Sequence, residues 1–180
     1  MHILGLDPGL NTTGYAVLEC VPGRKAVAEA GVIRSEAGGT TAGRLKVLYD
    51  GLVEVIEQWK PGAMAVEQLY AHYDHPRTAI LMAHARGCYF LAGAQAGIPV
   101  VSYPSTRVKK LITGHGRATK EQMQYAVMRE LGLAKLPEPH DVADALAIAL
   151  CHAHALGLGD ASGVVSKGVN TAAMFEDEEE

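Results

Sequence analysis

The opening of the chain constrains the fold most, because two apolar runs there flank a tight turn. Residues 3–6 are almost continuously apolar, which is typical of a strand buried on both faces of a sheet. The turn that follows contains Pro8, Gly9 and Asn11, and apolar residues resume after Gly14. This pattern predicts a β-hairpin at the start of the chain.

Asp7 ends the first apolar run, at the point where the chain turns. A carboxylate at the end of a buried strand costs free energy unless cations or several hydrogen-bond donors meet it. The segment alone allows two interpretations. Asp7 either caps the turn by accepting hydrogen bonds from its own downstream backbone, as Asp often does, or it serves a metal or phosphate group.

The remainder of the chain predicts an α/β fold built on a five-stranded mixed sheet, three antiparallel strands followed by two parallel ones, flanked by helices. The hairpin and a third run at residues 26–33 are joined by short turns, so these strands should be antiparallel. An amphipathic helix over Thr41–Trp59 leads into strand 63–66, and such a crossover makes this strand parallel to the first. Residues 98–102 form the fifth strand. Further helices are expected over residues 76–96, 104–112, 119–131 and 141–154.

Three more acidic residues stand at the ends of these elements. Glu67 directly follows strand 63–66 and should lie at the same sheet edge as Asp7. Asp141 and Asp144 are three residues apart, so they share one face of the first turn of the last helix. A solvated strand end could explain Glu67, and an N-cap with an acidic third residue could explain the pair. That explanation of the pair gives no reason for the other two carboxylates.

If the four carboxylates converge, their negative charges repel strongly unless divalent cations neutralise them. Carboxylate-rich sites prefer hard cations, so Mg²⁺ or Mn²⁺ is expected rather than zinc. Two such ions ~4 Å apart can activate a water and stabilise the leaving oxygen in phosphodiester hydrolysis. The sequence contains no Ser/His/Asp or Cys/His grouping that competes with this interpretation.

Charge is distributed unevenly along the chain, although the formal net charge is only −4. Residues 157–180 carry −5, whereas residues 105–135 carry +5. A basic block beside a nearly neutral body is a candidate surface for phosphate groups, and the alternative is a solvated helix face. The basic residues of this block include Lys109, Lys110, Arg117 and Lys120.

The length of 180 residues suits one domain with a single sizeable core. We expect this domain to span residues 1–156, because residues 157–180 lack periodicity and predict a disordered acidic tail. Apolar runs stay below the ~18 residues needed to span a bilayer, and the start lacks the features of a secretory signal. The three cysteines are widely spaced and form no disulfide framework. These features favour a cytoplasmic protein.

The order of elements, with acids at two strand ends and an acidic pair opening the last helix, resembles the ribonuclease H-like superfamily. A closer resemblance, over about residues 1–156, is to the RuvC Holliday-junction resolvases of bacteria. The segments that carry it are GLDPG at residues 5–9 with Thr13 and Gly14, VEQ at 66–68, ARG at 85–87, GIPV at 97–100 and HDVADALAIA at 140–149.

The resemblance implies a homodimer that resolves four-way (Holliday) DNA junctions by paired nicks in homologous recombination and DNA repair. It implies Mg²⁺ or Mn²⁺ as the cofactor, with two ions per active site, and the RuvA–RuvB branch-migration complex as a partner. The residues that match the family's catalytic and metal-binding acids are Asp7, Glu67, Asp141 and Asp144. His140, next to this acidic pair, could assist them.

The resemblance also extends to DNA-binding positions. Tyr70 falls where the family has an aromatic residue that meets junction bases, and Lys109 and Lys120 fall on its DNA-binding lysines. Lys110 and Arg117 belong to the same basic block and are expected to contribute. His84 stands where members often have Gln, a departure that could alter the interface but not the chemistry.

The helix over residues 76–96 has small residues four apart on one face, at Ala79, Ala83 and Gly87. Such a stripe lets another helix approach closely, either inside the core or across a dimer interface. We expect this face at or near the contact between two subunits, because paired nicks in a two-fold symmetric junction need two active sites.

Three alternatives share part of the pattern. A nucleotide-handling fold of the actin and sugar-kinase type also opens with Asp-x-Gly after its first strand, but it needs a second, duplicated domain. A non-catalytic junction-binding protein has no need of four acids at matching positions. A generic ribonuclease H would share the acids and would differ in preferring an RNA–DNA hybrid to a four-way junction.

Overall fold

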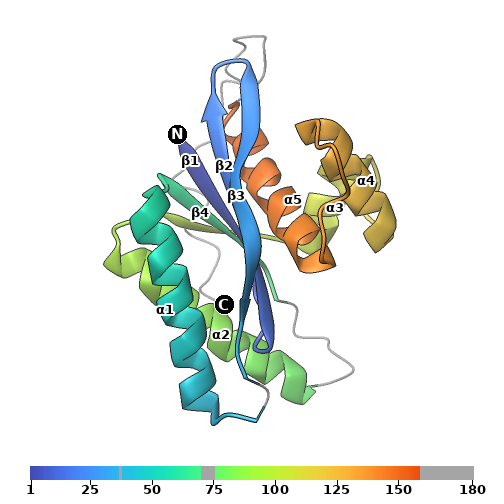
Figure 1. Cartoon of the computed structure of the whole chain (residues 1–180). Helices are drawn as coiled ribbons and strands as arrows, with labels where there is room; N and C mark the ends of the chain where they lie inside the picture. The colour runs from blue at the N-terminus through green and yellow to red at the C-terminus, as the bar shows by residue number, and fades with distance from the viewer. Residues whose placement is uncertain (37, 70–75, 159–180) are drawn as a thin grey trace, which may run out of the picture.

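The computed structural model describes residues 1–36, 38–69 and 76–158. Its centre is a five-stranded sheet with helices on both faces (Figure 1). The strands are β1 (His2–Asp7), β2 (Thr12–Val21), β3 (Arg24–Arg34), β4 (Ala63–Glu67) and β5 (Val100–Tyr103). The helices are α1 (Thr41–Trp59), α2 (Pro76–Gln95), α3 (Ser105–Thr113), α4 (Lys120–Leu131) and α5 (His140–Ala155).

The order of the strands in the sheet is β3-β2-β1-β4-β5. β1 pairs with β2 and β2 with β3 in antiparallel fashion, whereas β4 is parallel to both β1 and β5. The predicted mixed sheet is therefore confirmed. In the parallel pair of β1 and β4, Leu6 lies opposite Val66. The next residue of each strand, Asp7 and Glu67, consequently reaches the same edge of the sheet.

Several strand boundaries differ by one or two residues from those expected. The turn between β2 and β3 consists of only Pro22 and Gly23, so both strands extend further toward it. Gly23 has a φ of +74°, a conformation that glycine adopts without steric cost. β5 begins at Val100 rather than at residue 98, because the amide of Ile98 bonds to the carbonyl of Gly93 in α2 at 2.9 Å.

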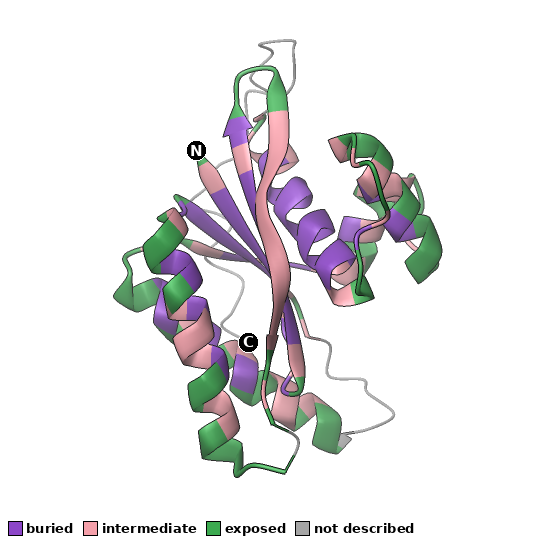
Figure 2. Ribbon diagram, in the orientation of Figure 1, coloured by how far each residue is buried: buried purple, intermediate pink, exposed green. Residues whose placement is uncertain are grey.

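The two faces of the sheet are covered by different layers. α1 and α2 pack on one face, where their side chains form a cluster with alternate residues of β1 and β2. α5 lies on the other face, and α3 and α4 pack against its outer side (Figure 1). Figure 2 shows that most of α5 is buried, which its position between the sheet and the outer helices requires.

α5 approaches the sheet closely because small residues face each other across the contact. A Cβ atom on Gly5 would lie 2.2 Å from the carbonyl oxygen of Ala145 and 2.8 Å from the Cβ atom of Ala149. Only glycine fits at this point of β1. The backbones of β1 and α5 are therefore in direct contact.

The described fold continues past α5 for a few residues. The amide of Leu158 bonds to the carbonyl of Ala153 at 2.9 Å, and the Leu158 side chain packs against the core. The rest of the predicted tail lies outside the described residues, so the domain limits stay a prediction. No helix in the described ranges combines the length and apolar character that crossing a membrane would demand.

Candidate active site

Asp7 and Glu67 lie side by side where β1 and β4 end, as the sequence predicts. Their carboxyl groups share a hydrogen bond, which requires a proton on one of them. Burial raises the pKa of Asp7 well above its usual range, and the negative charges of Glu67 and Asp144 raise it further. These carboxylates cannot all be ionised unless positive charge reaches them.

The turn-cap interpretation of Asp7 is not what the loop hydrogen bonds favour. The amide of Gly9, two residues after Asp7, donates to Thr13 Oγ1 at 3.2 Å. Thr13 thus supplies the side-chain acceptor in this turn. The carboxyl group of Asp7 bonds instead across the sheet edge to Glu67.

The acidic pair on α5 does not cap that helix. α5 begins at His140, one residue earlier than expected, and its N-cap residue is Pro139, which makes no side-chain cap. The amide of Val142 bonds to the Pro139 carbonyl at 3.0 Å, so Asp141 is already inside the first turn. The N-cap interpretation of Asp141 is therefore wrong.

Asp144 is held near Asp7 because α5 crosses the β1–β2 hairpin closely. Gly14 pairs with Asp7 across the two strands. A Cβ atom on Gly14 would lie 2.0 Å from the carbonyl oxygen of Asp141, so glycine is needed there for the first turn of α5 to approach. Burial raises the pKa of Asp144, and the charge of Asp141 acts in the same direction.

A cavity of about 420 Å³ joins these carboxylates to two lysines. Asp7, Glu67 and Asp144 line it from the sheet and α5, and Lys109 and Lys120 line it from α3 and α4. The positive charge of both lysines lowers the pKa of Asp144, against the larger effect of burial. The cavity therefore combines carboxyl groups with cationic side chains able to attract a phosphate.

Ser105 is a residue of this site that the sequence analysis missed. It is the first residue of α3, and its side chain bonds to the carboxyl group of Glu67. Burial raises the pKa of Glu67, while this hydrogen bond and the charge of Lys109 act to lower it. The available signal was the register of the parallel strands, since Glu67 lies opposite Tyr103, two residues before Ser105.

The chemistry of this donor set fits a divalent cation. The three raised pKa values share one cause, buried carboxyl groups with too little positive charge around them. Within residues 1–36, 38–69 and 76–158, no three His, Cys, Asp or Glu side chains form a group able to hold a metal ion. A hard divalent cation can be bound by only one or two carboxylates, with water or substrate phosphate completing its coordination.

The structure separates the other predicted residues from this cavity. Asp141 does not line it, although its charge acts on both Asp7 and Asp144. His140 lines a different groove, of about 810 Å³, beside α4. Lys110 lines a pocket beside Cys151 of α5, and Arg117 is exposed between α3 and α4. The predicted base-stacking residue, Tyr70, lies outside the described residues.

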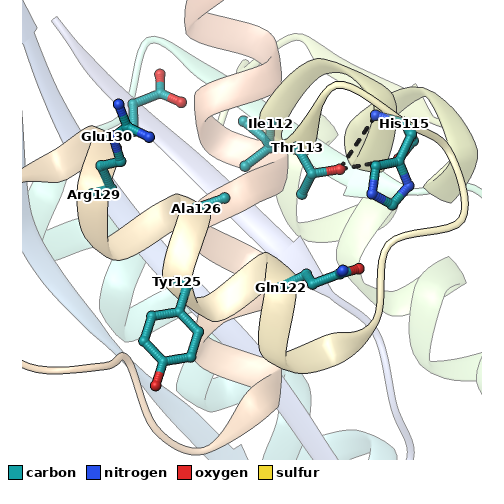
Figure 3. Close-up of a pocket in the computed structure, with 8 residues that line it drawn as sticks. All are labelled: Ile112, Thr113, His115, Gln122, Tyr125, Ala126, Arg129 and Glu130. Carbon is teal, nitrogen blue, oxygen red and sulfur yellow. Dashed lines mark hydrogen bonds between the residues drawn. The ribbon is translucent and has the colours of Figure 1, made fainter.

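The groove between α3 and α4 is larger than the carboxylate cavity, at about 580 Å³, but it lacks the same chemistry (Figure 3). Among the described residues that line it, the one carboxylate is Glu130. Its Oε1 atom is 2.6 Å from His154 Nε2 and 3.2 Å from Lys25 Nζ. His154 and Lys25 lower the pKa of Glu130, so this carboxylate is already neutralised within the fold.

One face of α2 is apolar and exposed. Ala83 and Gly87 are exposed on it, in agreement with the predicted small-residue stripe, whereas Ala79 is half-buried. Two large residues flank the small ones: Ile80 is 58% exposed and Leu91 is 53% exposed. The sequence analysis did not single out these two residues. We refer to Ile80, Ala83, Gly87 and Leu91 as the α2 stripe.

Comparison with known proteins identifies the family to which this chain belongs. The family model described as crossover junction endodeoxyribonuclease RuvC matches residues 3–152. The enzyme of that name from Rhodopirellula baltica is 56% identical over 149 residues, which cover 83% of this chain and 84% of the relative. The one from Desulforamulus reducens is 45% identical over 153 residues, covering 85% and 93%.

Solved structures give the same result at the level of the fold. T. thermophilus RuvC in complex with a Holliday junction substrate superposes with a TM-score of 0.79 at 34% identity, covering 85% of this chain and 93% of that one. The fowlpox virus resolvase, at 12% identity and a TM-score of 0.54, shares the fold alone. The matched residues and the shared ribonuclease H-like sheet show that this chain belongs to the RuvC family of crossover junction endodeoxyribonucleases.

Proposed function

We propose that this chain resolves four-way DNA junctions by metal-dependent hydrolysis of phosphodiester bonds, with Asp7, Glu67, Asp141 and Asp144 as its acidic site residues. The observation that carries the proposal is the cavity in which three half-buried carboxyl groups face two lysines. A nuclease of this class needs both a set of hard oxygen donors and a way to attract a charged phosphate.

The proposed role of each acid in metal binding depends on whether it lines the cavity. Asp7, Glu67 and Asp144 line the cavity and would bind the ions directly, and Asp141 would complete the set from its edge. Two Mg²⁺ or Mn²⁺ ions bound there would neutralise the carboxylates, activate a water and stabilise the leaving oxygen. Ser105 orients Glu67 through their hydrogen bond.

The cationic residues are proposed to bind DNA in two groups, one inside the carboxylate cavity and one outside it. Lys109 and Lys120 line the carboxylate cavity and would contact the phosphate that is cleaved. Lys110 and Arg117 are exposed on α3 and on the loop that follows it, where they would contact flanking phosphates. In the same proposal Tyr70 stacks on a junction base, worth ~1–3 kcal/mol.

His140 is proposed to assist through its charge rather than as a ligand. It is exposed at the start of α5, and in its protonated form it lowers the pKa of Asp144. This effect would favour the ionised form of Asp144, which is the form that binds metal.

The α2 stripe is the surface that we assign to a second copy of this chain. Two exposed small residues, Ala83 and Gly87, would let two helices approach closely, while Ile80 and Leu91 would supply the apolar area. The homodimer would place one active site on each of two strands of a junction. As the family resemblance implies, it would act with the RuvA–RuvB branch-migration complex in the bacterial cytoplasm.

The decisive experiment replaces acids by their amides. Asp7→Asn keeps the shape of the side chain but removes the charge that holds a hard cation. Cleavage of a synthetic mobile junction should fall roughly 100-fold or more, because loss of a direct ligand should exceed the 10–100-fold typical of changes around the ligands. Junction binding measured without divalent ions should survive. Glu67→Gln, Asp141→Asn and Asp144→Asn should behave in the same way.

The matched control is Asp50→Asn, which removes an exposed carboxylate paired with Lys46 on α1. Its cleavage rate should equal that of the unaltered protein. Near-normal nicking by Asp7→Asn would falsify the metal-site proposal. Faster cleavage of an RNA–DNA hybrid than of the junction would instead favour a generic ribonuclease H.

A further inference from the structure

A buried hydroxyl group is one of the contacts that hold the loop between β1 and β2, besides the hydrogen bonds from Ser35 to the carbonyls of Leu10 and Asn11. Thr13 is fully buried, and its Oγ1 atom donates to the Gly9 carbonyl at 2.8 Å while accepting from the Gly9 amide at 3.2 Å. The same atom bonds to the phenolic oxygen of Tyr89, which comes from α2. Thr13 therefore connects the loop that follows Asp7 to a helix 76 residues further along the chain.

The direction of these hydrogen bonds follows from the number of protons available. A threonine hydroxyl has one proton and two lone pairs. Because the Thr13 proton goes to the Gly9 carbonyl, Thr13 Oγ1 must accept from both the Gly9 amide and Tyr89. The phenolic proton of Tyr89 thus completes the bonding of Thr13. A phenylalanine at this position would leave a buried lone pair without a donor.

The hydrogen bonds of Thr13 and Tyr89 are close to Asp7 but outside the carboxylate cavity. Gly9 is two residues after Asp7, and Thr13 precedes Gly14, the residue that pairs with Asp7. Tyr89 is close enough to Asp7 for the charge of that carboxylate to raise the pKa of the phenol, in addition to the larger effect of burial. Neither Thr13 nor Tyr89 lines the carboxylate cavity.

Core packing alone gives no reason for these two hydroxyl groups. Both side chains are fully buried, so neither can touch DNA or a catalytic water in the folded protein. A buried hydrogen-bonded pair contributes little more to stability than an apolar pair of the same shape. The pair instead restricts the conformation of the loop that follows Asp7, because three hydrogen bonds of defined geometry meet at Thr13.

We propose that Thr13 and Tyr89 are positioning residues, which hold the Asp7 carboxyl group in the orientation needed for junction cleavage. The proposal rests on the proposed function of Asp7. It assigns to α2 a second role besides its exposed stripe, since the buried side of the same helix supports the active site.

The experiment compares the loss of single hydroxyl groups. Tyr89→Phe and Thr13→Val should each lower kcat for junction cleavage about ten-fold, since small misplacement of a reacting group costs this much or more. The Kd for the junction without divalent ions should change by less than about two-fold, because neither residue touches DNA. Thr13→Ser keeps the hydroxyl and should restore most of kcat.

A measurement without catalysis tests the same inference. Mg²⁺ is titrated into the DNA-free protein, and the amide chemical shifts of residues 7–14 are followed. Tyr89→Phe should raise the Mg²⁺ concentration at the midpoint about three-fold or more, because a misoriented Asp7 binds the ion less well. Tyr15→Phe is the matched control. Tyr15 is on β2, as Thr13 is, but its hydroxyl donates to Glu29 of β3 at 3.0 Å and not to the loop after Asp7. This variant should leave kcat and the midpoint unchanged.

The outcomes separate this inference from the proposed function. If Tyr89→Phe and Thr13→Val cleave normally while Asp7→Asn does not, the positioning role is wrong and the function stands. A lower melting temperature with normal kcat in the folded protein would likewise reduce the pair to a structural role. Normal cleavage by Asp7→Asn would reject the function itself.

Discussion

The two faces of the sheet are packed in different ways. As a result, the helix on one face is positioned more accurately than the helices on the other. On the α5 face, backbone meets backbone, as the 2.2 Å between a Cβ atom on Gly5 and the Ala145 carbonyl oxygen indicates. On the α1–α2 face, large side chains such as Leu48, Leu52 and Tyr89 fill the space between the layers. Side chains can change rotamer, whereas backbone atoms in contact cannot shift without moving a whole element.

The division between the faces agrees with what each helix carries. α5 carries Asp141 and Asp144, whose position relative to Asp7 must be accurate to about 0.5 Å for metal chemistry. α2 carries an exposed apolar stripe, which tolerates small adjustments because a partner surface can adapt to it. The closely packed face thus positions the carboxylates, and the face filled by large side chains provides hydrophobic stabilisation.

The largest expected effect comes from adding one methyl group to each face. Gly5→Ala should lower the free energy of unfolding by about 3 kcal/mol or more, because the new methyl group meets the backbone of α5. Gly93→Ala on α2 places its methyl group 2.6 Å from Val100 Cγ2 and 2.7 Å from Met64 Cε, which are ends of side chains. The free energy of unfolding should fall less than for Gly5→Ala, because side-chain atoms can shift more easily than backbone and alanine favours the helix.

Urea denaturation of both variants under the same conditions measures the difference. Equal losses of free energy for Gly5→Ala and Gly93→Ala would show that the two faces yield to a methyl group alike. The contrast between backbone and side-chain packing would then be wrong.

A second difference should appear as a pH dependence of stability. His152 on α5 is buried, its Nδ1 atom lies 2.8 Å from the hydroxyl of Tyr103, and burial lowers its pKa to about 4. Above pH 6.5 the imidazole is neutral in both the native and the unfolded protein. Between pH 6.5 and 4 the unfolded chain binds a proton that the native protein excludes, so stability falls, by roughly 3 kcal/mol at most.

Unfolding free energies of the unaltered protein and of His152→Phe, measured from pH 8 to pH 4, test this expectation. The variant should be less stable at pH 8 because Tyr103 loses its partner, but its stability should decline less toward low pH. His115→Gln is the control, because His115 is exposed in the loop after α3. An unchanged slope in His152→Phe would exclude this histidine as the source of acid sensitivity.

The smallest effect on stability is expected for the outer side of α2. Ala83→Arg should change the free energy of unfolding of the monomer by less than about 0.5 kcal/mol, because the site is exposed. It should nevertheless convert dimers to monomers in sedimentation experiments, since a charged side chain would enter the proposed contact. Val47→Arg on α1, an exposed apolar residue outside the stripe, should leave the oligomeric state unchanged. An unaltered dimer for Ala83→Arg would move the interface elsewhere.

The sequence predicts those features that depend on local pattern. The mixed sheet could be predicted because each apolar run ends at a clear turn, and Asp7 and Glu67 could be paired because both end buried parallel strands. α4 begins with a capping box, in which Thr119 and Gln122 bond reciprocally, and these two residue types three positions apart are a local signal of a helix start. These features need only the few residues around them.

Features that depend on distant contacts could not be predicted in this way. Tyr89 meets Thr13 only after α2 has packed on the sheet, and Ser105 reaches Glu67 only through the register of two parallel strands. The start of α5 was misplaced because capping preferences favour Asp at the N-cap, whereas the chain turns into the helix one residue earlier, after Pro139. Each of these features depends on how the chain is arranged in three dimensions, which the residues nearby in sequence do not reveal.

The contact of Gly14 with the Asp141 carbonyl has a consequence for anyone who wishes to redesign this enzyme. Because the acidic pair is located by a backbone contact, its geometry cannot be retuned by exchanging core side chains, the usual route in protein engineering. Grafting the four carboxylates onto another scaffold would require the hairpin and the first turn of α5 to be transferred together. Adjusting the reactivity of the site would instead have to begin at α3 and α4, whose lysines reach the cavity through long, adaptable side chains.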